Sequence, residues 1–302
     1  MPKETNFVEV EAGERDRHYY HRMVECEGSF AMLSLHEDVT DAIIFVHGFG
    51  GDSYGTWAQF QLLIDQWEAV KAEFAKRDLY FFQYHSVWER VESSSNRLLK
   101  FMRLLIPEIN LEHFAMDVGP VTVPKEESSG EVSEFVVPFP KDRKYERVTL
   151  AGHSEGGVVI RTMIVRDLEN TALLNCRLAL FAPAIAGYKP AGLLGSMANF
   201  PGLGLLLEAV LVAAPAYQDL KDKEDLKQLK TDTETAHSKG RALCADILWG
   251  HKDYVVKPQK YACDTQDFED CNHTQICKPS EDYPKPLDHV KKWPDEKKEE
   301  HK

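Results

Sequence analysis

The chain has 302 residues, 43% of them hydrophobic, and its 36 basic and 49 acidic side chains give a net charge of −13 at pH 7. This length suits one large α/β domain with a substantial core. The negative charge repels phosphate backbones and anionic headgroups, so nucleic-acid binding is not expected.

The N-terminal residues indicate where in the cell the protein is expected and predict the first strands of a sheet. Residues 1–20 contain no apolar stretch typical of a signal peptide or membrane anchor, and the six cysteines in this setting indicate reduced thiols. A cytoplasmic location is therefore expected. Alternating apolar and polar residues at 7–12 and 18–27 then predict antiparallel edge strands.

Five short, nearly continuous apolar runs predict parallel strands that are buried on both faces of a sheet. They lie at 41–46, 79–84, 147–151, 177–182 and 246–249. Between the second and third runs, residues 96–106 place basic side chains on one face and apolar side chains on the other, as in an amphipathic crossover helix. This order predicts an α/β protein with a doubly wound, mostly parallel sheet.

Two insertions interrupt the alternation. The first, about 112–145, has a hairpin-like pattern and enters at the amino ends of the strands, away from the ligand side of such sheets. The second, about 186–240, follows the carboxyl end of a strand and predicts a helical lid. Its apolar half, 191–217, has one charged residue, Glu208, and Pro201 helps to break it into pieces too short to span a bilayer. No stable membrane span is expected, although the lid could touch a lipid interface.

The remaining segments set the expected domain boundary. The other half of the second insertion, 219–237, predicts an amphipathic helix with mixed charge. Residues 281–302 are rich in lysine and glutamate and predict a charged, frayed tail. We therefore expect one domain over 1–280 that carries both insertions.

The segment 147–161, RVTLAGHSEGGVVIR, contains a G-x-S-x-G motif built on Gly152, Ser154 and Gly156. A predicted strand leads into it and an apolar helical stretch follows, which is the strand-turn-helix context that exposes a nucleophilic serine. The glycines remove side chains that would collide in so sharp a turn. The alternative, a serine that only caps the helix, is less favoured in this context.

A serine hydroxyl needs a base and an orienting acid to become a nucleophile. In the nucleophile-elbow architecture the chain order is serine, acid, histidine, each after a strand. Asp253 lies just past the strand at 246–249, and His273 follows in a loop. The competing acids are Asp246, Asp264, Asp267 and Asp270, and the competing histidines are His47, His153, His251 and His289. Chain order and strand-end position favour Asp253 and His273.

The negative charge that develops on an attacked carbonyl needs hydrogen-bond donors. The loop HGFGG follows the strand at 41–46 and brings backbone close to a substrate. The predicted donors are the backbone N–H groups of Phe49 and of Glu155, the residue after the nucleophile. A dinucleotide-binding interpretation of these glycines fails because Ser53 stands at the third glycine position.

These residues resemble the α/β-hydrolase superfamily, and within it lipase-like serine esterases that combine HGFGG at 47–51, GHSEGG at 152–157 and HTQICKP at 273–279. The resemblance covers about residues 40–280. It implies an α/β-hydrolase fold, a triad of Ser154, Asp253 and His273, an oxyanion loop suited to esters with medium or long acyl groups, and no cofactor or metal.

Two features depart from the family pattern. Glu155 puts a carboxyl group beside the nucleophile, where many relatives have Met or Gln. Only residues 254–272 separate the acid from the histidine, so the last helix and strand must be abbreviated. Cys271 and Cys277 flank His273, and with Cys263 they offer a disulfide or metal clip as a less favoured way to brace its loop.

The expected function is hydrolysis of a small, hydrophobic carboxylic ester through an acyl-enzyme on Ser154. Two alternatives remain open from the sequence. One is an acyltransferase or amidase that uses the same three residues. The other is a receptor or interaction protein that keeps the fold without turnover.

Overall fold

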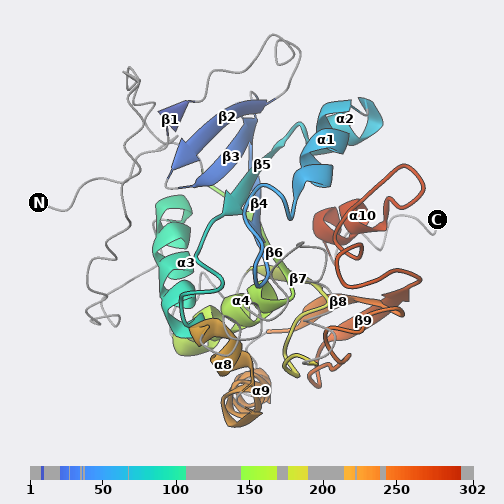
Figure 1. Cartoon of the computed structure of the whole chain (residues 1–302). Coiled ribbons are helices and arrows are strands. Elements are labelled where there is room, and N and C mark those ends of the chain that lie inside the picture. Colours follow the sequence, from blue (N-terminus) through green and yellow to red (C-terminus); the bar gives the residue numbers. More distant parts are fainter. Residues whose placement is uncertain are drawn as a thin grey trace, which may run out of the picture.

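The computed structural model describes most of the chain. The described residues are 8–9, 21–26, 28–34, 36, 38–66, 68–106, 144–168, 176–189, 214–221, 223–238 and 243–293. They form one nine-stranded sheet with helices against both of its faces (Figure 1).

The sheet has the strand order β1-β2-β3-β5-β4-β6-β7-β8-β9. The first three strands and β5 pair antiparallel, and every pair from β5–β4 to β8–β9 is parallel. The strands are β1 (Val8–Glu9), β2 (His21–Cys26), β3 (Ser29–Ser34), β4 (Asp41–Val46), β5 (Arg77–Phe82), β6 (Arg147–His153), β7 (Arg177–Phe181), β8 (Ala245–Gly250) and β9 (Thr265–Glu269). The central strands are buried along their length because helices cover both faces, which explains their continuous apolar sequences.

Seven helices of the described residues form two layers (Figure 1). The helices α3, α4, α8 and α9 lie on one face of the sheet, and α1, α2 and α10 lie on the other. Their bounds are α1 (Ala58–Gln66), α2 (Glu68–Phe74), α3 (Val91–Leu105), α4 (Glu155–Arg166), α8 (Pro215–Lys221), α9 (Lys223–Ser238) and α10 (Lys285–Lys291). The helix expected over 96–106 begins earlier, because Asp219 accepts a hydrogen bond from the Val91 N–H at 2.9 Å and so caps its first turn.

The two expected insertions are described only in part. The hairpin-like segment at 112–145 lies almost wholly outside the described residues, as do residues 190–213 of the expected lid. The described remainder forms α8 and α9, and α9 packs on α4 and buries Leu226 and Leu229. This half of the second insertion belongs to a helical layer of the domain. A lid over 191–217 stays a prediction.

The sequence predicts a charged, frayed tail from residue 281, and this prediction is wrong over residues 281–293. The helix α10 docks against the sheet with Leu287 and Val290 buried. The Arg177 guanidinium donates hydrogen bonds to the carbonyls of His289 and Val290, which fixes the helix end. The domain therefore extends past residue 280. The sequence did not reveal this because the two buried apolar residues stand among many charged ones.

The connection between β8 and β9 is unusually short for parallel strands. Residues 251–264 join them without a helix, whereas a parallel crossover usually contains one. The short spacing between Asp253 and His273 is thus explained by the absence of the last crossover helix, whereas the last strand, β9, is present. With its mixed, mostly parallel sheet and a strand-turn-helix at Ser154, the chain has the α/β-hydrolase fold. None of the described helices is both long enough and apolar enough to cross a membrane.

Candidate active site

A sharp turn between β6 and α4 places Ser154 at the carboxyl edge of the sheet. The backbone of Ser154 has φ 54° and ψ −117°, a strained combination for a residue with a side chain. Its N–H donates to the Phe181 carbonyl at 2.9 Å. A Cβ on Gly156 would collide with the Val46 carbonyl oxygen, and one on Gly152 would come within 2.7 Å of another side chain. The glycines of the motif are therefore required by close packing of β4, β6 and α4.

The structure brings the three predicted side chains into one hydrogen-bonded row. His273 Nε2 lies 3.0 Å from Ser154 Oγ, and His273 Nδ1 lies 2.7 Å from Asp253 Oδ2. Their exposed fractions are 2% for Ser154, 6% for Asp253 and 8% for His273. Because a carboxylate can only accept, Nδ1 carries the proton and Nε2 is left to accept the serine proton. This is the arrangement of a nucleophile, a base and an orienting acid.

Asp253 is an ionised acceptor despite its burial. Its Oδ1 accepts backbone hydrogen bonds from Val255 at 2.8 Å and Val256 at 3.1 Å. Burial alone would raise the pKa of Asp253, but the hydrogen bond from His273 and the two backbone donors lower it below its usual value. The acid therefore keeps its negative charge and its orientation.

Hydrogen bonds hold the loop that carries His273. His153 Nε2 donates to the His273 carbonyl at 2.9 Å, and burial lowers the pKa of His153 to about 3, so this imidazole is neutral. The Lys252 N–H donates to the Cys271 carbonyl at 3.1 Å, and a Cβ on Gly250 would collide with the same carbonyl. Cys271 and Cys277, which flank His273, and Cys263 form no disulfide. The loop is thus braced by hydrogen bonds and close packing.

The competing acids all have other partners. Asp246 binds Arg177, Asp264 binds Arg161, Asp267 binds Lys285 and Asp270 binds Lys252. Among the competing histidines, His47 stacks on Tyr84, His251 on Phe268, and His289 packs edge-on against Phe181. Geometry therefore selects the pair that chain order favoured.

A cavity of about 390 Å³ opens over Ser154. Phe49, Tyr188, Val255 and Cys277 are among the residues that line it. Asp52 and Lys278 line it as well, but most of the lining surface is apolar, and Ser154 is part of it. The cavity can therefore hold an apolar group against the nucleophile.

Sequence reasoning missed Tyr188, whose hydroxyl lies 3.4 Å from Ser154 Oγ. Burial raises the pKa of Tyr188 well above its usual value. Its hydroxyl therefore stays protonated. Tyr188 stands near the start of the second insertion, where no local sequence pattern points to the site, and tertiary packing places it beside Ser154.

The two predicted oxyanion donors flank the nucleophile. Phe49 lies in the loop after β4, where a Cβ on the preceding Gly48 would come within 2.8 Å of the Ser154 side chain. Glu155 is the first residue of α4. Their backbone N–H groups thus belong to segments beside Ser154, and their role as donors stays a prediction.

The side chain of Glu155 is an anomaly. It is fully buried at 0% exposure, and neither carboxyl oxygen has a hydrogen-bond partner. Burial, and then the charges of Asp219 and Glu89, raise the pKa of Glu155 well above its usual value. The carboxyl group beside the nucleophile is accordingly neutral rather than anionic.

Compared by sequence, the chain matches no protein-family model and no curated protein. Solved structures with a similar backbone include the lipase BlEst2 of Bacillus licheniformis (15% identity, 83% of this chain and 92% of that chain, TM-score 0.48). Others are the peroxisomal alpha-beta-hydrolase Lpx1 of Saccharomyces cerevisiae (12%, 90% and 82%, 0.48) and the Pyrococcus furiosus esterase Pf2001 (12%, 91% and 84%, 0.44). At these identities no residue role is carried across.

Proposed function

We propose that the protein is a serine hydrolase that cleaves carboxylic esters through an acyl-enzyme on Ser154. The observation that carries the proposal is the hydrogen-bonded row of Ser154, His273 and Asp253 at the base of a cavity. Such a row gives a serine hydroxyl the base and the acid that nucleophilic attack requires.

The reaction proceeds in two halves. His273 Nε2 takes the proton of Ser154 as its oxygen attacks the ester carbonyl, and Asp253 stabilises the imidazolium that forms. The oxyanion receives hydrogen bonds from the backbone N–H groups of Phe49 and Glu155. Collapse expels the alcohol, which takes the proton from His273. Water, deprotonated by the same histidine, then releases the acid and restores Ser154.

The walls of the cavity favour a small, hydrophobic ester as substrate. Phe49, Val255 and Cys277 offer apolar contacts for an acyl chain. The neutral state of Glu155 adds no negative charge beside the reacting carbonyl. The Tyr188 hydroxyl, 3.4 Å from Ser154 Oγ, is a polar group beside the position of the reacting carbonyl. The cytoplasmic location expected from the sequence stays a prediction.

The proposal is tested by turnover of p-nitrophenyl esters from acetate to palmitate. The wild type is expected to hydrolyse them, with a loss of roughly 10⁴-fold in kcat for Asp253→Asn and at least as large a loss for Ser154→Ala. Asp270→Asn is the matched control, since this exposed acid lies near His273 in sequence and is paired with Lys252. It should retain wild-type turnover.

Two results would contradict the proposal. One is a folded wild type that turns over no ester of the panel, and the other is a Ser154→Ala variant that remains active. Product analysis with added alcohols and amines distinguishes hydrolysis from acyl transfer, because a transferase passes the acyl group to the acceptor rather than to water.

A further inference from the structure

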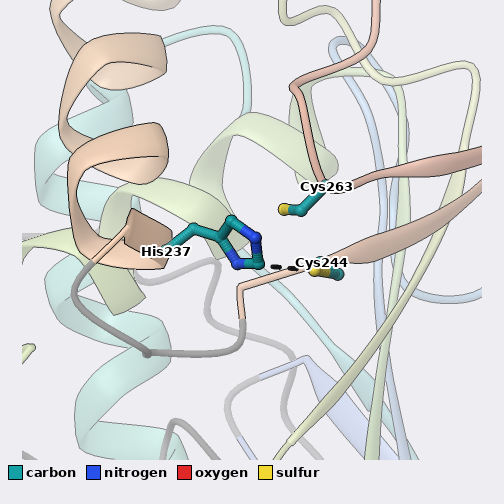
Figure 2. A group of neighbouring side chains, drawn as sticks. All are labelled: His237, Cys244 and Cys263. Atoms are coloured by element: carbon teal, nitrogen blue, oxygen red, sulfur yellow. Dashed lines mark hydrogen bonds between the residues drawn. The ribbon is translucent and has the colours of Figure 1, made fainter.

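Three potential metal ligands from separate segments meet at the amino edge of the sheet. His237 lies in the last turn of α9, Cys244 directly precedes β8, and Cys263 lies two residues before β9. One ligand atom from each lies within 4.8 Å of the others, and His237 Nδ1 is 3.8 Å from Cys244 Sγ. Figure 2 shows the imidazole turned toward the two thiols. His237 and Cys244 are exposed and Cys263 is half-buried, so solvent can reach the cluster.

The sheet register places the two cysteines together. In the parallel ladder of β8 and β9, Asp246 pairs with Thr265. Cys244 lies two residues before Asp246, and Cys263 lies in a turn two residues before Thr265, so this first pair of the ladder brings both cysteines to the same end of the two strands. There the two thiols face the imidazole at the end of α9.

Buried polar contacts hold this framework rigid. Asp264 accepts hydrogen bonds from Ala245 N–H, beside Cys244, and from Tyr261 N–H, both at 2.9 Å. The Arg161 guanidinium, 1% exposed, donates to both oxygens of Asp264 at 2.7 Å. The segments that carry Cys244 and Cys263 are thereby fixed by one buried ion pair.

A further hydrogen bond ties the helix to the same point. Glu234, one turn before His237 in α9, accepts from the Ala262 N–H at 3.3 Å. Ala262 is the neighbour of Cys263 in the chain. All three ligand-bearing segments are therefore positioned by contacts that do not involve the ligand atoms, as in a prearranged site.

The ligand set selects the kind of ion. Two thiolates and one imidazole suit zinc and similar borderline-soft divalent cations, whereas calcium and magnesium prefer oxygen. A tetrahedral zinc ion with metal–ligand distances of about 2.0 to 2.3 Å spaces its ligand atoms about 3.3 to 3.8 Å apart. The His237–Cys244 distance already matches this spacing. Side-chain rotations that move the ligand atoms by about 1 Å would bring the separations of up to 4.8 Å to this spacing.

We propose that His237, Cys244 and Cys263 form a zinc-class metal site that clips α9 to the starts of β8 and β9. Water completes the coordination. The site lies at the amino edge of the sheet, opposite the carboxyl edge that carries Ser154, so its role is structural. It braces the connection of residues 251–264, which lacks a crossover helix and leads to β9 and the His273 loop.

A Cys244–Cys263 disulfide is the rival occupant of the same two thiols. It would leave the imidazole of His237 without a role, whereas the metal uses all three groups. Metal binding releases the thiol protons without oxidation of sulfur, whereas disulfide formation requires an oxidant and no metal.

The full chain, reduced and stripped with a chelator, is titrated with Co²⁺ as a spectroscopic substitute for Zn²⁺. We expect one ion per chain, with the visible bands of tetrahedral cobalt and a thiolate-to-cobalt charge-transfer band. Cys244→Ser, Cys263→Ser and His237→Gln should each weaken binding by at least about tenfold. Cys176→Ser and His251→Gln are the matched controls and should bind as the wild type does.

Zinc should raise the Tm of the wild type and of the two controls, and leave the three ligand variants unchanged. Near-ultraviolet circular dichroism verifies that each variant is folded. The proposal is overturned by a wild type that gives no charge-transfer band, by a band that survives in Cys263→Ser, or by a Cys244–Cys263 disulfide that persists in the metal-loaded protein.

Discussion

Replacing Glu155 by glutamine changes the pH dependence of stability in a direction that the structure dictates. The carboxyl group is fully buried and has no hydrogen-bond partner, so the folded protein retains its proton where an unfolded chain loses it. Folding then binds a proton from solution. The contribution of this carboxyl group to the stability of the wild type therefore falls as the pH rises above the pKa of an unfolded glutamate, until the pKa of the folded state is reached.

The magnitude follows from linkage. Each pH unit in this window costs the wild type roughly 1.4 kcal/mol through Glu155 alone, and the window opens near pH 4.3, the usual pKa of an unfolded glutamate. By pH 6 the penalty is roughly 2 kcal/mol. The glutamine side chain of the Glu155→Gln variant has nearly the same shape and does not titrate. Burial of its amide adds an offset that is constant with pH, so the slope isolates the carboxyl group.

Urea unfolding between pH 4.5 and 7.5 measures this slope for the wild type, for Glu155→Gln and for the exposed control Glu281→Gln. The Glu155→Gln variant should gain stability relative to the wild type as the pH rises, whereas the control should follow the wild type. Parallel curves for the wild type and Glu155→Gln would refute the reasoning, because they would mean that the carboxyl ionises at its usual pKa.

Three further substitutions test other contacts. Tyr188→Phe removes the hydroxyl that lies 3.4 Å from Ser154 Oγ and competes with His273 for hydrogen bonding to the serine, so kcat for p-nitrophenyl butyrate should rise about two- to fivefold. An unchanged kcat would contradict this. Gly156→Ala places a Cβ against the Val46 carbonyl and should lower the free energy of unfolding in urea by about 3 kcal/mol. An unchanged free energy of unfolding would mean that the turn at Ser154 can relax around the added methyl group. Burial, and then Arg177, lower the pKa of His289 to about 4, so this imidazole alone should cost the wild type about 1.4 kcal/mol per pH unit on acidification from pH 6.5 toward 4, opposite in sign to the contribution of Glu155. His289→Gln should therefore gain stability relative to the wild type as the pH falls, and a difference that is constant with pH would contradict this.

The sequence predicts the parts of the fold that helices cover on both sides. Ile43 and Ile44 in β4 are both buried, so adjacent apolar residues mark the strand. The edge strand β9, Thr265–Glu269, has four exposed residues and no apolar pattern to reveal it. In α10 the two anchors Leu287 and Val290 lie among charged residues. Elements held by few apolar contacts are hidden from such reasoning because their pairing partners come from distant sequence.

The residues of the site likewise fall into those that the sequence predicts and those that it does not. Ser154, Asp253 and His273 follow from chain order and from their places at strand ends, because parallel strands end at one edge of the sheet. Tyr188 and the unpartnered carboxyl of Glu155 do not follow, since their positions depend on how the walls of the site pack. The approach of Cys244 to Cys263 depends on the β8–β9 register, which the sequence leaves open.

Labelling of Ser154 by a fluorophosphonate is the most direct test of the central claim, that this serine is an activated nucleophile. Mass spectrometry of peptides from the wild type should find the phosphonyl adduct on Ser154. Labelling should be absent in Ser154→Ala and much slower in His273→Gln, because the base is then missing. A folded wild type that remains unlabelled, or one labelled at another serine, would contradict the account.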